Sequence, residues 1–319
     1  MEKIVECKDV VRVFTSRTFL GKKQETRALD GLSFTIPQGI VFGLLGPNGS
    51  GKTTTIRILA TLLTPTSGQA KVLGYDVVKE ASKVRGRIGL ILGGERGLYG
   101  RLTGEENLKY FAALNHLNRE AANKRIKEIL ELVNLAQDSK RNVEQYSRGM
   151  RQRLHIARGL LTDPEVLFMD EPTIGLDPAG AQELRQLIPS LVKRGKTILL
   201  TTHYMSEADE LSQQVAIISR GKLIATGTPS VIKRSFAKIT VCEVICRQTQ
   251  TNAVDAVQVL PGIQRVTAIA DGPIQRITIQ MKPGTEFKAK VTEILGKSNI
   301  ESLVMRDPTL EEAYLSIIK

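Results

Sequence analysis

Near its start the chain reads Gly46-Pro47-Asn48-Gly49-Ser50-Gly51-Lys52-Thr53, and this run matches the pattern G-x-x-x-x-G-K-[ST]. An apolar run at residues 40–45 precedes the glycines, and residues 54–63 follow with the apolar spacing of a helix. A buried strand, a glycine-rich loop and a helix in this order form the context in which the pattern binds a nucleotide. The stretch therefore predicts a site for the phosphates of ATP or GTP.

Each part of this segment has a physical reason to hold phosphate. Glycines let successive backbone N–H groups turn toward phosphate oxygens, and the start of the helix adds its positive dipole end. Lys52 is placed to reach the β- and γ-phosphates, and the Thr53 hydroxyl is placed to ligate Mg²⁺. The predicted nucleotide-binding residues here are Gly46, Pro47, Asn48, Gly49, Ser50, Gly51, Lys52, Thr53 and Thr54.

Length and composition limit the classes of protein that remain. The chain has 319 residues, of which 41% are hydrophobic, which suffices for one large domain with a small one, or for two of ordinary size. No apolar stretch approaches the roughly 20 residues that span a bilayer, and residues 1–5 lack the apolar segment of a signal peptide. We expect a soluble cytoplasmic protein, or one that a partner holds at a membrane.

The charge and the cysteines restrict the partners. A net charge of +12 favours a polyanionic neighbour, either an anionic lipid surface or nucleic acid. Aromatic residues make up only 4% and do not alternate with basic residues as they do where single-stranded bases stack, which makes nucleic acid less favoured. Three scattered cysteines, Cys7, Cys242 and Cys246, are too few for a disulfide framework or a zinc site.

Four short apolar runs read as strands of a mostly parallel, buried sheet. They are residues 40–45, 88–92, 166–169 and 197–202. The phosphate loop follows the first run, Asp170-Glu171 follows the third, and His203 follows the fourth. Because ligands of open α/β sheets bind beyond the carboxyl ends of the strands, we expect these groups to meet at one edge of the sheet.

The rest of the chain predicts a helical insertion and a second, smaller domain. Residues 103–135 read as helices, and residues 215–218 and 223–225 read as a hairpin. Beyond Thr228-Pro229 the pattern runs strand, helix, strand, strand, helix, strand and final helix, which suggests a small ferredoxin-like α+β unit. The predicted domains are 1–230 for an α/β domain of the P-loop type with a helical part at about 95–163, and 231–319 for the α+β unit.

The carboxylates at the end of the third strand resemble a Walker B element. Asp170 would hold Mg²⁺ through its water, and Glu171 would orient and deprotonate the attacking water. Adjacent carboxylates in a loop are more often a solvated pair. The buried strand before them, in a chain that carries a phosphate loop, favours the catalytic interpretation.

A further segment reads Tyr146-Ser147-Arg148-Gly149-Met150-Arg151-Gln152-Arg153, and it resembles the signature sequence of ATP-binding cassette (ABC) proteins. In that family two cassettes sandwich the nucleotide, and the signature of one faces the phosphate loop of the other. Ser147 can cap a helix that directs its N–H groups and dipole at a γ-phosphate, and Gly149 permits close approach. The resemblance closely covers residues 3–227.

The resemblance implies roles for further residues. Gly175-Leu176-Asp177 matches the D-loop that links the two sites of a dimer, with Asp177 next to the nucleotide. His203 matches the switch histidine that contacts the γ-phosphate. Phe14 stands where the family places an aromatic ring on adenine, although Phe19 is close enough to be an alternative.

Two positions depart from the family pattern. Arg148 replaces the second glycine of the signature, where it either adds positive charge near the opposite nucleotide or faces solvent. The Q-loop glutamine expected after residues 88–92 is absent, and Gly93-Gly94-Glu95-Arg96 stands there. Either Glu95 substitutes for it, or hydrolysis relies on Glu171 and His203 alone, so we expect slower turnover without inactivity.

The resemblance implies the ATP-binding and ATP-hydrolysing subunit of an ABC transporter, working with ATP and Mg²⁺. The tail at residues 308–314 is similar to that of cassettes that export drugs, antibiotics, polysaccharides or ions. Two copies, or this chain and a related cassette, would close on ATP and drive separate transmembrane permease subunits at the cytoplasmic face of the membrane. The helical insertion and residues 93–100 would form the docking surface.

Two other functions stay open at this point. One is a soluble cassette ATPase that acts on nucleic acid or ribosomes, although such proteins usually carry a second cassette or a long coiled coil, and neither is evident here. The other is a regulatory nucleotide-binding module without turnover, which the missing glutamine would suit. The transported substrate cannot be read from this sequence, because a permease selects it.

Overall fold

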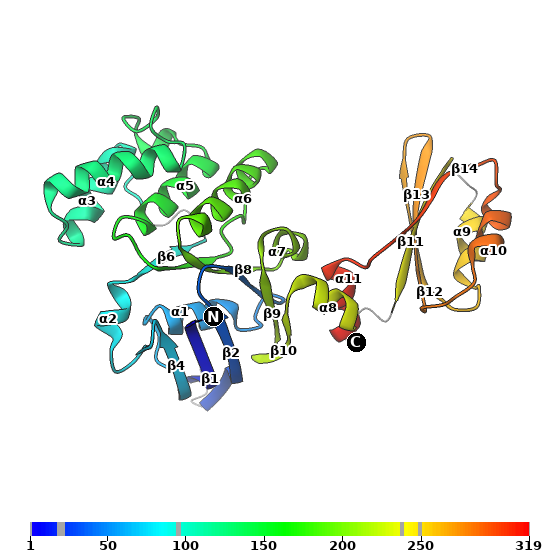
Figure 1. The fold of residues 1–319 in the computed structure, drawn as a ribbon, viewed down its shortest axis with the longest axis horizontal. Coiled ribbons are helices and arrows are strands. Elements are labelled where there is room, and N and C mark those ends of the chain that lie inside the picture. The colour runs from blue at the N-terminus through cyan, green and yellow to red at the C-terminus, as the bar shows by residue number, and fades with distance from the viewer. Residues whose placement is uncertain (1, 18–22, 94–96, 237–238, 248–250, 319) are drawn as a thin grey trace. The chain divides into compact units, whose positions relative to one another are not determined.

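The computed structural model of the chain describes residues 2–17, 23–93, 97–236, 239–247 and 251–318. It divides into two compact units, Met1–Thr228 and Pro229–Lys319 (Figure 1). Every predicted site residue, from Phe14 to His203, lies in the first unit.

A six-stranded sheet forms the centre of the first unit, in the order β10-β9-β3-β8-β7-β6. Its strands are β3 (Val41–Leu45), β6 (Ile88–Leu92), β7 (Val166–Asp170), β8 (Thr197–Thr202), β9 (Gln214–Ser219) and β10 (Lys222–Gly227). All neighbours pair in parallel except β10, which forms an antiparallel hairpin with β9. These strands confirm the four apolar runs and the hairpin that the sequence predicts.

Both faces of this sheet are covered, which explains why its central strands are apolar throughout. Alternate side chains of β7 enter two separate cores: Leu167 and Met169 pack with the helices α3 to α6, while Val166 and Phe168 pack with α1 and a second sheet. The helices of the first unit are α1 (Lys52–Leu59), α2 (Ala81–Arg85), α3 (Gly104–Leu114), α4 (Arg119–Leu132), α5 (Arg148–Gly159), α6 (Pro178–Lys193) and α7 (Met205–Leu211), with a 3-10 turn η1 (Val143–Gln145). The central sheet is thus sandwiched between two layers (Figure 1).

The helical insertion forms where residues 103–135 predict it. A capping box starts α3, in which Thr103 accepts from the N–H of Glu106 and Glu106 accepts from the N–H of Thr103. Asn118 caps α4 by accepting from the N–H groups of Glu120 and Ala121. Buried side chains on one face of each helix join the larger core with α5 and α6, which fixes the insertion onto the sheet.

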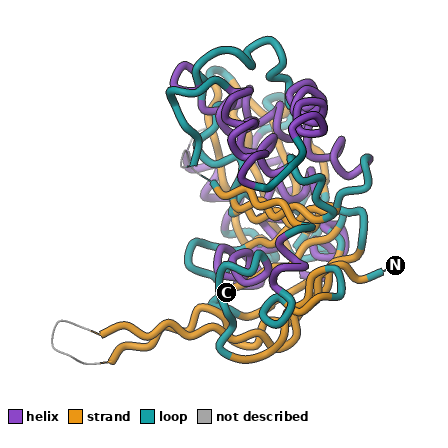
Figure 2. The backbone as a smooth tube through the Cα atoms, turned by 90° about the vertical axis from the view of Figure 1, so that its left-hand side faces the viewer, coloured by secondary structure: helices purple, strands orange, loops and turns teal. Residues whose placement is uncertain are grey.

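A second, antiparallel sheet was not predicted. It has the order β2-β1-β4-β5, with β1 (Lys3–Arg17), β2 (Lys23–Pro37), β4 (Ser67–Val72) and β5 (Tyr75–Asp76). The pairing of β1 with β2 shifts register at four places, which obscures the period-two alternation that marks a strand. The ends of these two strands lead away from the rest of the unit (Figure 2).

The second unit is built on an antiparallel sheet in the order β12-β13-β11-β14. Its elements are α8 (Pro229–Phe236), β11 (Thr240–Arg247), α9 (Thr251–Gln258), β12 (Ile263–Asp271), β13 (Ile274–Met281), α10 (Lys288–Leu295), β14 (Ile300–Arg306) and α11 (Leu310–Ile318). Cys242 and Cys246 are buried in the core that α9 and α10 cover. Thr309 and Glu312 form a capping box at the start of α11, the final helix that the sequence predicts.

Within the described ranges, none of the helices has both the length and the apolar character needed to cross a membrane.

Candidate nucleotide-binding site

The phosphate loop turns between β3 and α1, and its glycines are required by geometry. Gly51 has φ +109, and a Cβ built on it would lie 2.6 Å from Leu29 Cδ2 and 2.8 Å from the carbonyl oxygen of Ala28. A side chain at Gly51 would therefore be strained and would also push β2 away from the loop. The loop backbone is thus held close to β2, with the first N–H groups of α1 free to meet an anion.

Lys52 is the first residue of α1, and its side chain is only 4% exposed. Its Nζ donates to the carbonyl oxygens of Gly46 and Pro47, at 2.8 and 3.2 Å, and lies 3.4 Å from Glu171 Oε1. The ammonium group is therefore enclosed by the loop rather than extended into solvent. Thr53 and Thr54 follow at the half-buried start of the same helix.

The two carboxylates at the end of β7 are held differently. Asp170 is 8% exposed, and its Oδ1 accepts a hydrogen bond of 2.6 Å from the Thr201 hydroxyl. Glu171 adopts φ +47, a left-handed conformation that is uncommon for a residue with a side chain. Its N–H donates to the carbonyl and hydroxyl oxygens of Thr201, at 3.1 and 3.0 Å, and these bonds from β8 fix the turn.

His203 follows β8 and lies beside Glu171. The distance from His203 Nδ1 to Glu171 Oε2 is 3.0 Å, so a single carboxylate contacts both the lysine of the phosphate loop and this histidine. One turn later on α7, Glu207 is 3% exposed, and burial raises the pKa of its carboxyl group. Thr201 and Glu207 could not be predicted from the sequence, because a threonine in a strand and an acid in a helix carry no motif of their own.

The other predicted residues form a second cluster, at the starts of α5 and α6. Ser147 caps α5 by accepting from the N–H of Met150 at 3.2 Å, and Asp177 caps α6 by accepting from the N–H of Gly180 at 3.1 Å. Gly149 is buried against Gly180, since a Cβ on Gly149 would lie 3.5 Å from the Gly180 Cα. The signature segment and the D-loop segment are therefore packed together through glycines.

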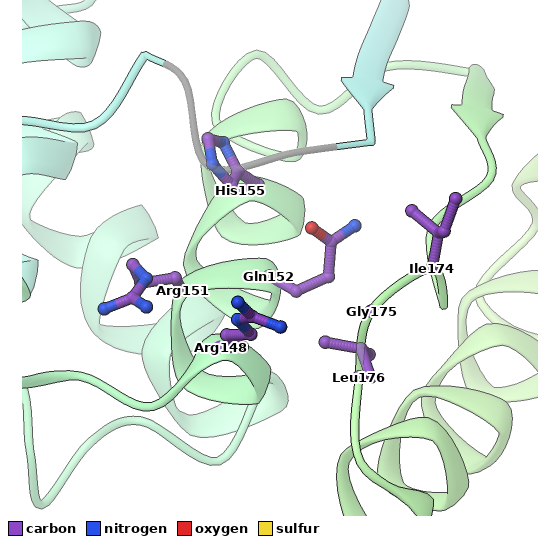
Figure 3. A pocket seen from close by; sticks show the side chains of 7 residues that line it. All are labelled: Arg148, Arg151, Gln152, His155, Ile174, Gly175 and Leu176. Atoms are coloured by element: carbon purple, nitrogen blue, oxygen red, sulfur yellow. The ribbon is translucent and has the colours of Figure 1, made fainter.

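A small cavity of about 160 Å³ lies between α5 and the D-loop segment (Figure 3). Its lining consists of Arg148, Arg151, Gln152, His155, Ile174, Gly175 and Leu176. Arg148 is exposed, and its Nη1 would lie 4.0 Å from a Cβ built on Gly175. His155 is 2% exposed, and burial lowers its pKa to about 4, which keeps the ring uncharged at neutral pH.

Phe14 lies on β1 with 39% of its surface exposed. The strand around it is paired with β2, whose residue Leu29 touches the phosphate loop at Gly51. Phe14 is therefore attached to the sheet that borders the loop. The alternative aromatic, Phe19, and the Q-loop candidate, Glu95, lie outside the described residues.

These observations define the class of protein. A glycine loop encloses a lysine, and the next strands of a parallel sheet deliver two carboxylates and a histidine to the same edge. This arrangement suits the binding and cleavage of a phosphate chain, as in P-loop nucleoside triphosphatases.

Comparison with known proteins gives the family. Residues 29–174 match the family model described as ABC transporter. The chain is 41% identical to the daunorubicin resistance ATP-binding protein DrrA3 of Streptomyces coeruleorubidus over 92% of both chains. Its fold is similar to that of cbiO1 from Clostridium perfringens, part of the ABC transporter complex cbiONQ, with a TM-score of 0.64 and 26% identity over 74% of this chain and 92% of that one. It is also similar to a dimeric, post-hydrolysis structure of the ATP-binding cassette MJ0796 bound to ADP and Pi, with a TM-score of 0.61 and 26% identity over 70% and 98% of the two chains.

The chain belongs to the ATP-binding subunits of ABC transporters, and its reaction is ATP hydrolysis coupled to transport. Its fold is the P-loop cassette with a mixed, mostly parallel sheet, followed by an antiparallel C-terminal sheet.

Proposed function

We propose that this chain hydrolyses ATP with Mg²⁺ to power export through separate permease subunits. The observation that carries the proposal is the contact of Glu171 with both Lys52 and His203, at 3.4 and 3.0 Å. Three segments far apart in sequence thus bring an ammonium group, a carboxylate and an imidazole together at one sheet edge. Each has a role in the cleavage of a γ-phosphate.

The roles follow from the surroundings of each group. Lys52, now bonded to the loop carbonyls, exchanges these for the oxygens of the β- and γ-phosphates. Glu171 accepts the proton of the attacking water, because it is the carboxylate that lies between the lysine and the histidine. His203 donates to the γ-phosphate and senses whether it is still attached.

The Mg²⁺ proposal is supported by the donor set. The Asp170 carboxylate and the Thr53 hydroxyl are hard oxygen donors, as Mg²⁺ prefers. Thr201 already bonds one oxygen of Asp170, which orients the carboxylate and leaves its other oxygen for the metal or its water. Asp170 and Thr53 would hold the ion, and the ion would neutralise charge that develops on the phosphates.

We infer that the second cluster completes the site of another cassette. Ser147, Gly149 and Asp177 lie at the starts of two helices, where N–H groups and dipoles favour a phosphate. The similarity to a dimeric cassette structure supports a dimer of this chain, or of this chain with a related cassette. A complex of this kind docks on permease subunits at the cytoplasmic face of a membrane, with the helical insertion as the contact.

The proposal also includes export and the form of the C-terminal unit. Export is favoured by the similarity to a daunorubicin resistance protein, a name that belongs to that relative and supplies a class rather than a substrate. For the C-terminal unit we propose a ferredoxin-like arrangement, because its strands and helices follow the order βαββαβ with β11 and β13 in the middle of the sheet.

The experiment is phosphate release from ATP by the complete chain, with and without Mg²⁺. Wild type should release phosphate only with Mg²⁺, and Glu171→Gln should bind ATP but release little. Glu165→Gln is the matched control, since Glu165 is an exposed acid directly before β7. Equal turnover in wild type and Glu171→Gln would remove Glu171 from the mechanism, and release without Mg²⁺ would remove the metal.

A further inference from the structure

One face of the Phe14 ring is covered by an arginine. Arg12 lies two residues earlier on β1. Its guanidinium carbon is 4.6 Å from the centre of the Phe14 ring. The guanidinium thus covers one face of the ring, while 39% of Phe14 remains exposed.

Arg12 is itself fixed in place. Its Nη1 donates to the carbonyl oxygen of Thr64 at 2.9 Å. Two further bonds join the same segments, from the Thr66 N–H to the carbonyl of Val11 at 2.8 Å and from the Val13 N–H to the Thr66 hydroxyl at 3.0 Å. Residues 64–66 follow the helix α1, so the strand that carries Phe14 is tied to the end of the phosphate-binding helix.

The pairing of β1 with β2 also connects the strand of Phe14 to the phosphate loop. Arg12 is opposite Leu29 in the β1–β2 pairing, and Leu29 contacts the phosphate loop at Gly51. The ring of Phe14 is therefore linked to both ends of the phosphate-binding segment, through Leu29 at its start and through Thr64 beyond its helix. A base stacked on Phe14 would therefore have a fixed position relative to a phosphate chain bound in that loop.

We propose that Arg12 is a positioning residue for the nucleotide base: it covers the back of Phe14 and holds the front face where a purine stacks. The inference rests on the proposed function, since it requires ATP at this phosphate loop. A guanidinium over an aromatic face is attracted by the ring's quadrupole, which holds the ring in one orientation. The ring then offers an ordered platform for base stacking on its opposite side.

The test compares ATP with inorganic tripolyphosphate, which has the phosphate chain but no base. Binding is measured by titration calorimetry on the complete chain without Mg²⁺. Arg12→Met should weaken ATP binding by about two- to fivefold, the range of an exposed cation–π contact. Tripolyphosphate binding should not change. Arg12→Lys retains a cation over the ring and should lose less than Arg12→Met.

Two further variants test whether Arg12 acts through the Phe14 ring or only through its charge. Arg27→Met removes the same charge from the neighbouring strand, where Arg27 pairs with Asp30 instead of a ring, and should leave both affinities unchanged. In a Phe14→Ala background, Arg12→Met should add nothing to the loss of ATP affinity.

Several results would overturn the inference. An equal loss of ATP and tripolyphosphate would show that Arg12 acts on phosphate or on folding, and a full effect of Arg12→Met without Phe14 would show that it does not act through the ring. A loss of ATP affinity in Phe14→Ala with no loss in Arg12→Met would refute only the role of Arg12. Unchanged ATP affinity in Phe14→Ala would refute the base platform itself.

Discussion

The uncharged His155 makes the stability of the cassette depend on pH. This ring is 2% exposed, and neither of its nitrogens has a hydrogen-bond partner in the described part of the chain. Burial, with a smaller contribution from the charge of Arg158, lowers the pKa of His155 from 6.5 to about 4. In the unfolded chain the ring regains its ordinary pKa, so the unfolded state binds more protons between these two values. Stability is therefore greatest above pH 6.5 and is lost as the pH falls toward 4.

The size of the effect follows from the shift. Each pKa unit corresponds to about 1.36 kcal/mol, so the whole shift amounts to about 3 kcal/mol below pH 4. Between pH 7.5 and pH 5.0, linkage gives a loss of about 2 kcal/mol in the free energy of unfolding. A variant without a titratable group here, His155→Phe, should lose about 2 kcal/mol less than wild type over the same interval.

The assay is urea unfolding at both pH values, followed by far-ultraviolet circular dichroism because the chain contains no tryptophan. The quantity to compare is the change in unfolding free energy between the two pH values, wild type against His155→Phe. Taking this difference cancels the carboxylates and other groups common to both proteins. If both proteins lost the same free energy within about 0.5 kcal/mol, burial would not keep His155 uncharged.

Three further outcomes are expected. Glu171→Gln should retain ATP binding and lose hydrolysis by about a hundredfold or more in a phosphate-release assay, because no base remains for the attacking water; near-normal turnover would contradict this. Gly51→Ala should weaken ATP binding by at least about tenfold, owing to the left-handed strain and the contact with β2, whereas Gly39→Ala, with φ +74 but open space around it, should bind normally. Arg306→Met should lower the stability of the C-terminal unit by about 2 kcal/mol, because Glu312 loses a partner in a partly buried place; unchanged hydrogen exchange in β11 and β14 would argue against it.

The central sheet could be predicted because its signals are local and strong. The strands β6 and β8 end where the apolar runs end, and β3 and β7 differ from the prediction by a single residue. Parallel strands buried on both faces read as short, near-continuous apolar runs. The meeting of the residues at their carboxyl ends could be predicted from these strands, and Lys52, Glu171 and His203 do meet there.

The sequence could not show the antiparallel sheet of β1, β2, β4 and β5. Bulges and one exposed face interrupt the pattern of β1 and β2, and their pairing depends on tertiary contacts. The bond from Arg12 to Thr64 could not be read from the sequence either, since the two residues lie 52 positions apart. The bonds from Thr201 that hold the two carboxylates likewise join residues 30 or more positions apart.

The central claim is that each nucleotide is enclosed by two cassettes, because Ser147 and Gly149 lie in a cluster apart from the Lys52–Glu171 contact. The most direct measurement is the mass of Glu171→Gln in solution, by sedimentation or light scattering, with ATP and Mg²⁺ and then with ADP. A dimer with ATP that returns to monomers with ADP is the expected result. A protein that stays monomeric when saturated with ATP, alone and with its permease, would contradict the account.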